Sequence, residues 1–265
     1  MDLAGASALV TGASGGIGNA IARALAARGV ALKLSARRVD VLEQLCGELG
    51  ATAEALPADL ADRGELAALI ERASDVDVLV ANAALPASGV VEDFTPEEID
   101  RALEVNLRAP MQMARALLPG MRERGRGHLL FISSLSGKVA SPGSAIYSAT
   151  KFGMRGFALG LRQDLHDSPV GVTTVFPGFI RGAGMFADSG AKLPPGVGTR
   201  TPEQVAAAVV RGIERDRGEI SVAPPSVRAI SAAGVLMPGA SAAVQRRLGG
   251  AEVSAAVAKG QREKR

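Results

Sequence analysis

Short apolar runs alternate with amphipathic segments along most of the chain. The amphipathic segments carry apolar residues three and four positions apart, as at Leu66, Leu69 and Ile70, and this spacing predicts helices. The runs are apolar at successive positions, which is typical of strands buried on both faces of a parallel sheet. The predicted strands are Ala6–Val10, Ala31–Ala36, Ala53–Ala58, Val76–Ala81, His128–Ser133, Val170–Phe176 and Glu219–Ala223.

The regular alternation of strand and helix predicts an α/β fold, a single doubly wound Rossmann-type domain with about seven parallel strands flanked by helices. The chain has 265 residues and shows no internal repeat and no linker before about Arg181. We therefore expect one dinucleotide-binding domain over residues 1–225 rather than two smaller domains.

Three later segments depart from this rhythm. Residues 181–200 are rich in Gly and Pro and predict a long loop with a short helix around Met185 and Phe186. Long loops in compact domains are usually functional or disordered, and we expect this one to contact substrate. Residues 226–250 predict an Ala-rich helical extension, and the small, polar and basic residues 251–265 predict a disordered tail.

The positive charge of the chain is concentrated near its C-terminal end. The net charge is +3, but residues 245–265 hold six basic and two acidic residues, so this segment carries +4 and the remainder carries −1. Aromatic residues make up 3% of the chain and Trp is absent, which leaves few side chains to stack on bases. We therefore expect no nucleic-acid partner, although the isoelectric point is about 9.3.

The single cysteine, Cys46, excludes an internal disulfide and fits a reducing compartment. The first ten residues lack the basic and apolar regions of a signal peptide. No apolar run reaches the roughly 18 to 20 residues that span a bilayer. These features predict a cytoplasmic protein without membrane contact, in which Cys46 packs as a small apolar side chain.

A glycine-rich turn, Thr11-Gly-Ala-Ser-Gly-Gly-Ile-Gly18, follows the first predicted strand and opens a helix. Glycine permits a tight turn and a close approach of the backbone to a ligand, and the helix N-terminus attracts a pyrophosphate. This strand–turn–helix context predicts dinucleotide binding, whereas a purely structural turn is the alternative. No Gly-Lys-Ser/Thr follows, so the turn is not a P-loop.

The residues after the second strand predict which dinucleotide binds. An NAD site usually places an acidic residue there on the ribose 2′-hydroxyl, but this chain has Arg37 and Arg38. A guanidinium suits a 2′-phosphate because its planar fork bonds two oxygens. Arg37 therefore favours NADP(H) over NAD(H), the alternative being two solvated arginines at a helix start.

Tyr147-Ser-Ala-Thr-Lys151 places a tyrosine and a lysine on one face of a predicted helix. A free phenol has a pKa near 10, and a neighbouring cation lowers the pKa by favouring the phenolate. The pair therefore predicts a general acid/base. The spacing alone is common, so a pair with no chemical role is the alternative, but Tyr147 is the only tyrosine in the chain.

Ser134 follows the fifth predicted strand, thirteen residues before Tyr147. Ligands of open parallel sheets bind beyond the carboxyl ends of the strands, so Ser134 is placed to hold a substrate oxygen. Ser133 is its neighbour, and only one of the two can face the site because side chains alternate along a strand.

These motifs, in this order, resemble those of the short-chain dehydrogenase/reductase family over about residues 5 to 223. The matching pieces are TGASGGIG at 11–18, DL at 59–60, ANAA at 81–84, Asn106, Ser134, YSATK at 147–151 and PG at 177–178. The resemblance implies an oxidoreductase that moves a hydride between NADP(H) and the carbonyl or secondary alcohol of a small molecule with an apolar part. It also implies a homodimer or homotetramer built on the helices that carry Asn106 and Tyr147.

The resemblance implies a role for each catalytic position. Tyr147 would be the acid/base, Lys151 would lower its pKa and bind the nicotinamide ribose, and Ser134 would polarise the carbonyl. Asn106 would hold a water that links Lys151 to solvent. Apolar side chains of the 181–200 loop, among them Leu193, would cover the substrate. The expected cofactor contacts are Gly12, Ser14, Gly16, Ile17, Gly18, Arg37, Asp59, Leu60, Asn82, Ala83, Tyr147, Lys151, Pro177, Gly178 and Ile180.

The chain departs from the family pattern in two places. The family often reads Asn-Asn-Ala-Gly where this chain has ANAA at 81–84, which puts contacts on the adenosine side in question. The family often carries a threonine that bonds the carboxamide where this chain has Gly182, so Arg181 or backbone groups would have to substitute.

Two other functions remain as alternatives: a non-catalytic NADP-binding sensor or scaffold, and an epimerase or dehydratase of the related extended family, which needs a larger substrate domain. His128 and His166 lie away from the expected site and predict structural roles. The acidic stretch after Thr95-Pro96 predicts a helix N-terminus, and no cluster has metal-ligand spacing, so no metal is expected.

Overall fold

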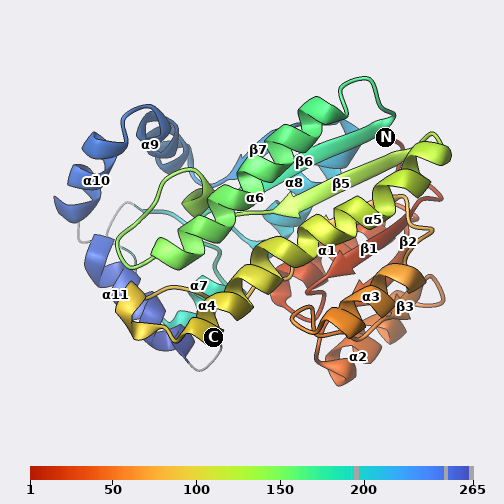
Figure 1. Ribbon diagram of the computed structural model, residues 1–265, viewed down its shortest axis with the longest axis horizontal. Helices are drawn as coiled ribbons and strands as arrows, with labels where there is room; N and C mark the ends of the chain where they lie inside the picture. The colour runs from red at the N-terminus through yellow and green to blue at the C-terminus, as the bar shows by residue number, and fades with distance from the viewer. Residues whose placement is uncertain (192, 194–196, 248–249, 263–265) are drawn as a thin grey trace.

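The structure is a computed structural model that describes residues 1–191, 193, 197–247 and 250–262. Its centre is a seven-stranded sheet in the order β3-β2-β1-β4-β5-β6-β7 (Figure 1). Every neighbouring pair of strands is parallel, which confirms the predicted doubly wound α/β fold. The strands are β1 (Ser7–Thr11), β2 (Ala31–Ser35), β3 (Ala53–Ala55), β4 (Val78–Ala81), β5 (Gly127–Ile132), β6 (Val170–Pro177) and β7 (Glu219–Val222).

Helices cover both faces of the sheet (Figure 1). On one face, Ile21, Leu42 and Val209 of α1, α2 and α8 pack into one buried cluster. On the other, Met113 and Met154 of α5 and α6 join α3 in a second cluster. The helices of the two layers are α1 (Gly16–Ala26), α2 (Val39–Leu49), α3 (Arg63–Arg72), α5 (Ala109–Glu123), α6 (Ala145–Asp164) and α8 (Pro202–Glu214). The continuous apolar strands are explained by this double burial.

Local sequence sets several helix starts. Thr95 caps α4 (Pro96–Leu103): its hydroxyl accepts from the Glu98 N–H at 3.2 Å, and the Glu98 carboxylate accepts from the Thr95 N–H at 2.9 Å. The acidic stretch is therefore a capping box, as expected. A π-helical turn, Glu104–Arg108, joins α4 to α5.

The strand order reverses beside β1, which lies between β2 and β4. All strands run the same way, so the segments that follow them meet at the carboxyl edge of the sheet. These are the segments after β1, β2, β4, β5 and β6. This crevice is where open α/β sheets bind ligands.

The C-terminal extension consists of three helices, α9 (Pro225–Leu236), α10 (Pro238–Arg247) and α11 (Gly250–Gln261) (Figure 1). The structure differs from the disordered tail expected over 251–265, because α11 is a helix that packs against α7 (Met185–Ser189) in the 181–200 segment. Its final residue, Gln261, is 2% exposed, so tertiary contact overrides the polar composition. Residues 263–265 of that expectation lie outside the described residues.

Among the described residues, no helix is both long enough and apolar enough to cross a membrane. His128 lies on β5 and is buried, with its Nε2 2.8 Å from Thr173 Oγ1. Burial lowers the pKa of His128 to about 4. His166 is exposed beside Asp167. His128 lies near the amino end of β5 and His166 just after the end of α6, so both lie away from the carboxyl ends of the strands.

Candidate active site

The glycine-rich turn between β1 and α1 is shaped by close backbone packing. Gly12 has a φ of +67°, and Gly18 packs so tightly on the Gly12 carbonyl that a side-chain carbon would not fit. Helix α1 begins after Gly15 without a side-chain cap and without an acidic residue in its first turn. The turn, which also contains Ser14 and Ile17, therefore offers uncapped backbone N–H groups to an anion and fits a pyrophosphate.

Asn82 joins the ends of β1 and β4 beneath this turn. Its side-chain nitrogen donates to the carbonyl oxygens of Thr11 at 2.9 Å and Gly12 at 3.3 Å. The Thr11 hydroxyl accepts from the backbone N–H groups of Asn82 and Ala83, both at 3.1 Å. These bonds fix the position of the turn relative to β4, because the Asn82 side chain holds the backbone of the turn.

Two arginines follow β2, and both are exposed. The Arg38 guanidinium donates to the Ser14 carbonyl oxygen and so lies over the glycine-rich turn. Arg37 is its neighbour on the same connection. The sequence singled out Arg37, whereas the structure brings the side chain of Arg38 to the glycine-rich turn.

Asp59 and Leu60 follow β3. Asp59 Oδ2 accepts from Arg101 Nη2 at 3.0 Å, and its Oδ1 accepts from the Ala61 N–H at 3.0 Å. The side chain of Leu60 is buried in the second apolar cluster. The α4 residue Arg101 therefore fixes Asp59, and the sequence pattern held no sign of this partner.

The two serines after β5 face different neighbours. Ser133 is buried, and its hydroxyl donates to the Lys151 carbonyl oxygen at 3.1 Å. Ser134 lies close enough to Tyr147 to lower the pKa of the phenol, and its Oγ accepts from the Ser136 N–H at 3.1 Å. Strand alternation thus separates a structural serine from the one that reaches the tyrosine.

Tyr147 and Lys151 lie one turn apart on α6. The Lys151 Nζ is 5.6 Å from the centre of the Tyr147 ring and donates to the Ile132 carbonyl oxygen at 3.1 Å. Lys151 is 3% exposed. Ser134, Tyr147 and Lys151 are therefore brought together at the carboxyl end of β5.

Burial dominates the protonation of this pair. It raises the pKa of Tyr147 to about 12, against the opposing effect of the Ser134 hydrogen bond, although the tyrosine keeps some solvent accessibility. Burial also lowers the pKa of Lys151 to about 8. The protein alone holds Tyr147 as a neutral phenol, which is the proton-donating form.

Asn106 lies in the π-helical turn and is buried. Its Oδ1 accepts from the Leu85 N–H at 2.6 Å and its Nδ2 donates to the Leu85 carbonyl oxygen at 2.9 Å. The side chain thus braces the segment after β4. The π-helical turn that carries Asn106 interrupts regular helix bonding, and such turns often occur at functional sites.

The segment after β6 runs from Pro177 into residues 181–200, the loop that we expect to contact substrate. The Gly178 N–H donates to the Val222 carbonyl oxygen at 3.0 Å, and Ile180 is buried beside Arg200. Gly182 has a φ of +80°, a conformation that a threonine would adopt only with strain.

The Arg181 guanidinium donates to the Thr199 hydroxyl at 3.2 Å. This bond joins the start of the 181–200 segment to Thr199 near its end.

The short chain dehydrogenase family profile matches residues 6–193 of this chain. The ketoacyl reductase HetN of Nostoc is 36% identical over 227 residues, which cover 83% of this chain and 79% of that protein. The chain belongs to the short-chain dehydrogenase family. It is an NAD(P)-dependent oxidoreductase of the hydride-transferring kind found in that family.

Solved short-chain dehydrogenases share the fold and differ in cofactor. One from Sphingobium yanoikuyae, in complex with NADPH, has a TM-score of 0.77 at 30% identity and covers 88% of this chain and 94% of its own. A 3-ketoacyl-(acyl-carrier-protein) reductase from Brucella melitensis, complexed with NADH, has a TM-score of 0.74 at 28% identity and covers 83% and 97%. Related members therefore bind either dinucleotide.

Proposed function

We propose that this short-chain dehydrogenase interconverts a carbonyl and a secondary alcohol with NADP(H), using Tyr147 as the acid/base. The observation that carries the proposal is the meeting of Ser134, Tyr147 and Lys151 at the carboxyl edge of the sheet, with the Lys151 Nζ 5.6 Å from the centre of the Tyr147 ring. Two hydroxyl groups there meet beside a buried amine, which is what polarising and protonating one substrate oxygen requires.

Each side chain has one task in this scheme. The Ser134 hydroxyl orients the substrate oxygen, and the neutral Tyr147 phenol donates its proton to that oxygen during reduction. The Lys151 ammonium, held by the Ile132 carbonyl, favours the phenolate that remains. When bound, the dinucleotide supplies or accepts the hydride. In oxidation, the Tyr147 phenolate takes the proton from the alcohol.

The dinucleotide fits the residues at this edge. The uncapped start of α1 and the crowded Gly12–Gly18 contact suit a pyrophosphate, with Ser14, Gly16 and Ile17 in the same turn. Arg37 and Arg38 favour a 2′-phosphate.

Toward the far end of the dinucleotide, Asp59 would contact the adenine. Pro177, Gly178 and Ile180 would border the nicotinamide.

Replacing Tyr147 by Phe tests the mechanism. Loss of the proton donor should lower kcat/KM by about 10²–10⁴-fold, while NADPH affinity changes little, because the aromatic ring remains in place. The assay is NADPH oxidation at 340 nm with a panel of ketones and a β-ketoacyl thioester, the latter suggested by the ketoacyl reductase relative. Unchanged turnover would remove Tyr147 from the mechanism.

A non-catalytic NADP-binding scaffold is the alternative function. It predicts NADPH binding by the wild-type protein without turnover of any carbonyl in the panel, and equal binding by Tyr147→Phe. A buried Lys151 beside the only tyrosine favours the enzyme, since a scaffold has no need of that arrangement.

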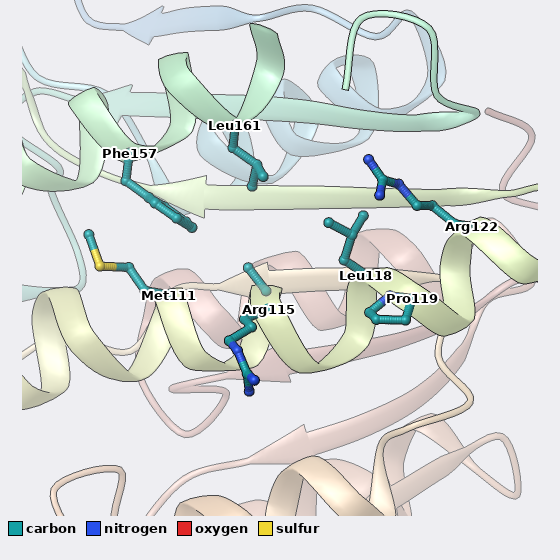
Figure 2. A pocket seen from close by; sticks show the side chains of 8 residues that line it. Met111, Arg115, Leu118, Pro119, Arg122, Phe157 and Leu161 are labelled. Carbon is teal, nitrogen blue, oxygen red and sulfur yellow. The ribbon is translucent and has the colours of Figure 1, made fainter. Parts of the chain in front are cut away.

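We also propose a homodimer or homotetramer that buries the outer face of α5 and α6. A groove of about 400 Å³ lies there, lined by Met111, Ala114, Leu118, Phe157 and Leu161, with arginines at its rim (Figure 2). Leu118→Glu should shift the mass measured by light scattering toward the monomer. An unchanged mass would place the interface elsewhere.

A cytoplasmic location stays a prediction from the single cysteine.

A further inference from the structure

The last helix of the extension presents one narrow face to the rest of the protein. On α11, Gln261 is buried and Ser254, Val257 and Ala258 are partly shielded, whereas Lys259 is exposed. The shielded positions are three and four residues apart, so they form one stripe along the helix. The small side chains of Ser254 and Ala258 in this stripe allow α11 to approach its neighbours closely.

One end of this stripe is fastened to the substrate loop. The Gln261 Nε2 donates to the Met185 carbonyl oxygen of α7 at 2.7 Å, and the side chain is buried. Beside it, Gly260 lies against Ser189, where a side-chain carbon at Gly260 would come within 2.5 Å of the Ser189 carbonyl oxygen. The two contacts lie at the two ends of α7, so α11 holds the whole short helix.

The other end of the stripe reaches the loop that precedes the catalytic helix. Ser254 Cβ lies 3.5 Å from the position that a Cβ would take at Gly143, just before α6. Helix α11 therefore connects α7 to the connection between Ser134 and Tyr147. In Figure 1 α11 lies along the same end of the molecule as α7 and α4.

The substrate loop in turn rests on the phosphate turn. Ala183 fills the space where Gly16 would carry a side chain, and Gly184 packs on Ile17. Gly182, Gly184 and Gly190 all have positive φ values, +80°, +86° and +66°, so the loop bends at both sides of α7. Bends of this kind let a short helix move as a unit when nothing holds it.

From these contacts we infer that α11 is a strap that positions the substrate loop, with Gln261 and Gly260 as its positioning residues. The strap holds α7 against the phosphate turn on one side and faces the connection before Tyr147 on the other. It thereby sets the size of the opening through which a carbonyl substrate enters. The inference rests on the proposed function only in naming α7 as a wall of the substrate site.

Two variants of the full-length protein test the strap. Gln261→Met keeps the length of the side chain and removes the donor to Met185. Gly260→Ala favours helix formation in α11 itself but places a methyl group against Ser189, so it separates docking from helix stability. The matched controls are Lys259→Met on the exposed face and Gly239→Ala, where a Cβ meets nothing within 4 Å.

The first readout is hydrogen exchange of the amides in residues 181–191, which needs no substrate. Both test variants should exchange about five- to tenfold faster there than the wild type, with β1–β6 unchanged, and the controls should match the wild type. The second readout is steady-state kinetics, in which KM for the carbonyl should rise severalfold while kcat changes little.

Equal exchange over residues 181–191 in test and control variants would overturn the strap. Faster exchange with KM unchanged would also overturn it, because the loop would then be released without consequence for substrate. Failure of the proposed function has a different signature: the wild type itself would not turn over a carbonyl, while the exchange difference would persist.

Discussion

The carboxamide of Asn106 pairs with the backbone of Leu85 in both directions, accepting at 2.6 Å and donating at 2.9 Å. Asn106→Asp keeps the shape but sets a carboxylate oxygen against the Leu85 carbonyl. Because the pair is buried, we expect the free energy of unfolding to fall by about 2–4 kcal/mol. Urea unfolding checks this, with exposed Gln163→Glu as the control for the charge change. An equal loss of unfolding free energy in the two variants would contradict a bracing role for the Asn106 side chain.

Arg37 and Arg38 should separate the two dinucleotides. Each alanine variant should weaken NADPH binding by about tenfold or more, because a charge-assisted bond to phosphate is lost, and leave NADH binding nearly unchanged. Parallel fluorescence titrations measure both affinities, with Arg211→Ala on the exposed side of α8 as control. Equal weakening of NADPH and NADH would mean that neither arginine reads the 2′-phosphate.

The low pKa of Lys151, about 8, predicts the pH dependence of cofactor binding. Below that pH the amine is a cation beside the site, and above it the charge is lost. NADPH affinity should therefore fall as the pH rises from about 7 to about 9.5. Lys151→Met should bind NADPH more weakly at neutral pH and show a flatter profile in the same titration. A slope in the variant equal to that of the wild type would assign the dependence to another group.

His128 should make the fold sensitive to acid. Burial lowers its pKa to about 4, whereas an unfolded histidine has a pKa near 6.5. Between these values the unfolded chain takes up a proton that the folded protein does not, so stability is lost as the pH falls from about 6.5 toward 4.

Replacing His128 by Gln should remove about 2–3 kcal/mol of that pH-dependent loss. The measurement is urea unfolding at about pH 7 and about pH 4.5, in which the difference between the two pH values is compared among proteins. Exposed His166→Gln is the control and should keep the wild-type difference. If His128→Gln loses as much stability between the two pH values as the wild type does, the acid sensitivity belongs to another group.

The sheet was predictable because its central strands β4, β5 and β6 are buried on both faces and so are largely apolar at successive positions. The predicted Ala31–Ala36 and the observed Ala31–Ser35 differ by one residue. Ser134, Tyr147 and Lys151 were predictable for a different reason, because a strand end and a helical turn fix their relative positions.

The remaining contacts depend on packing between distant segments. Arg38 bonds to Ser14 and Arg101 to Asp59 across loops that have no periodic pattern. The tail was predicted to be disordered because its composition is polar and small. Nothing in that composition says that Gln261 will meet the Met185 carbonyl.

The solitary phenol on α6 has a spectroscopic consequence. The chain contains one tyrosine and no tryptophan, so its absorbance near 295 nm in alkali comes from Tyr147 alone. A simple ultraviolet titration of the native protein therefore follows the ionisation of the group that we assign as proton donor, without labels or background subtraction. In most enzymes that signal is mixed with those of many other rings, whereas here the optical spectrum and the reacting proton belong to the same side chain.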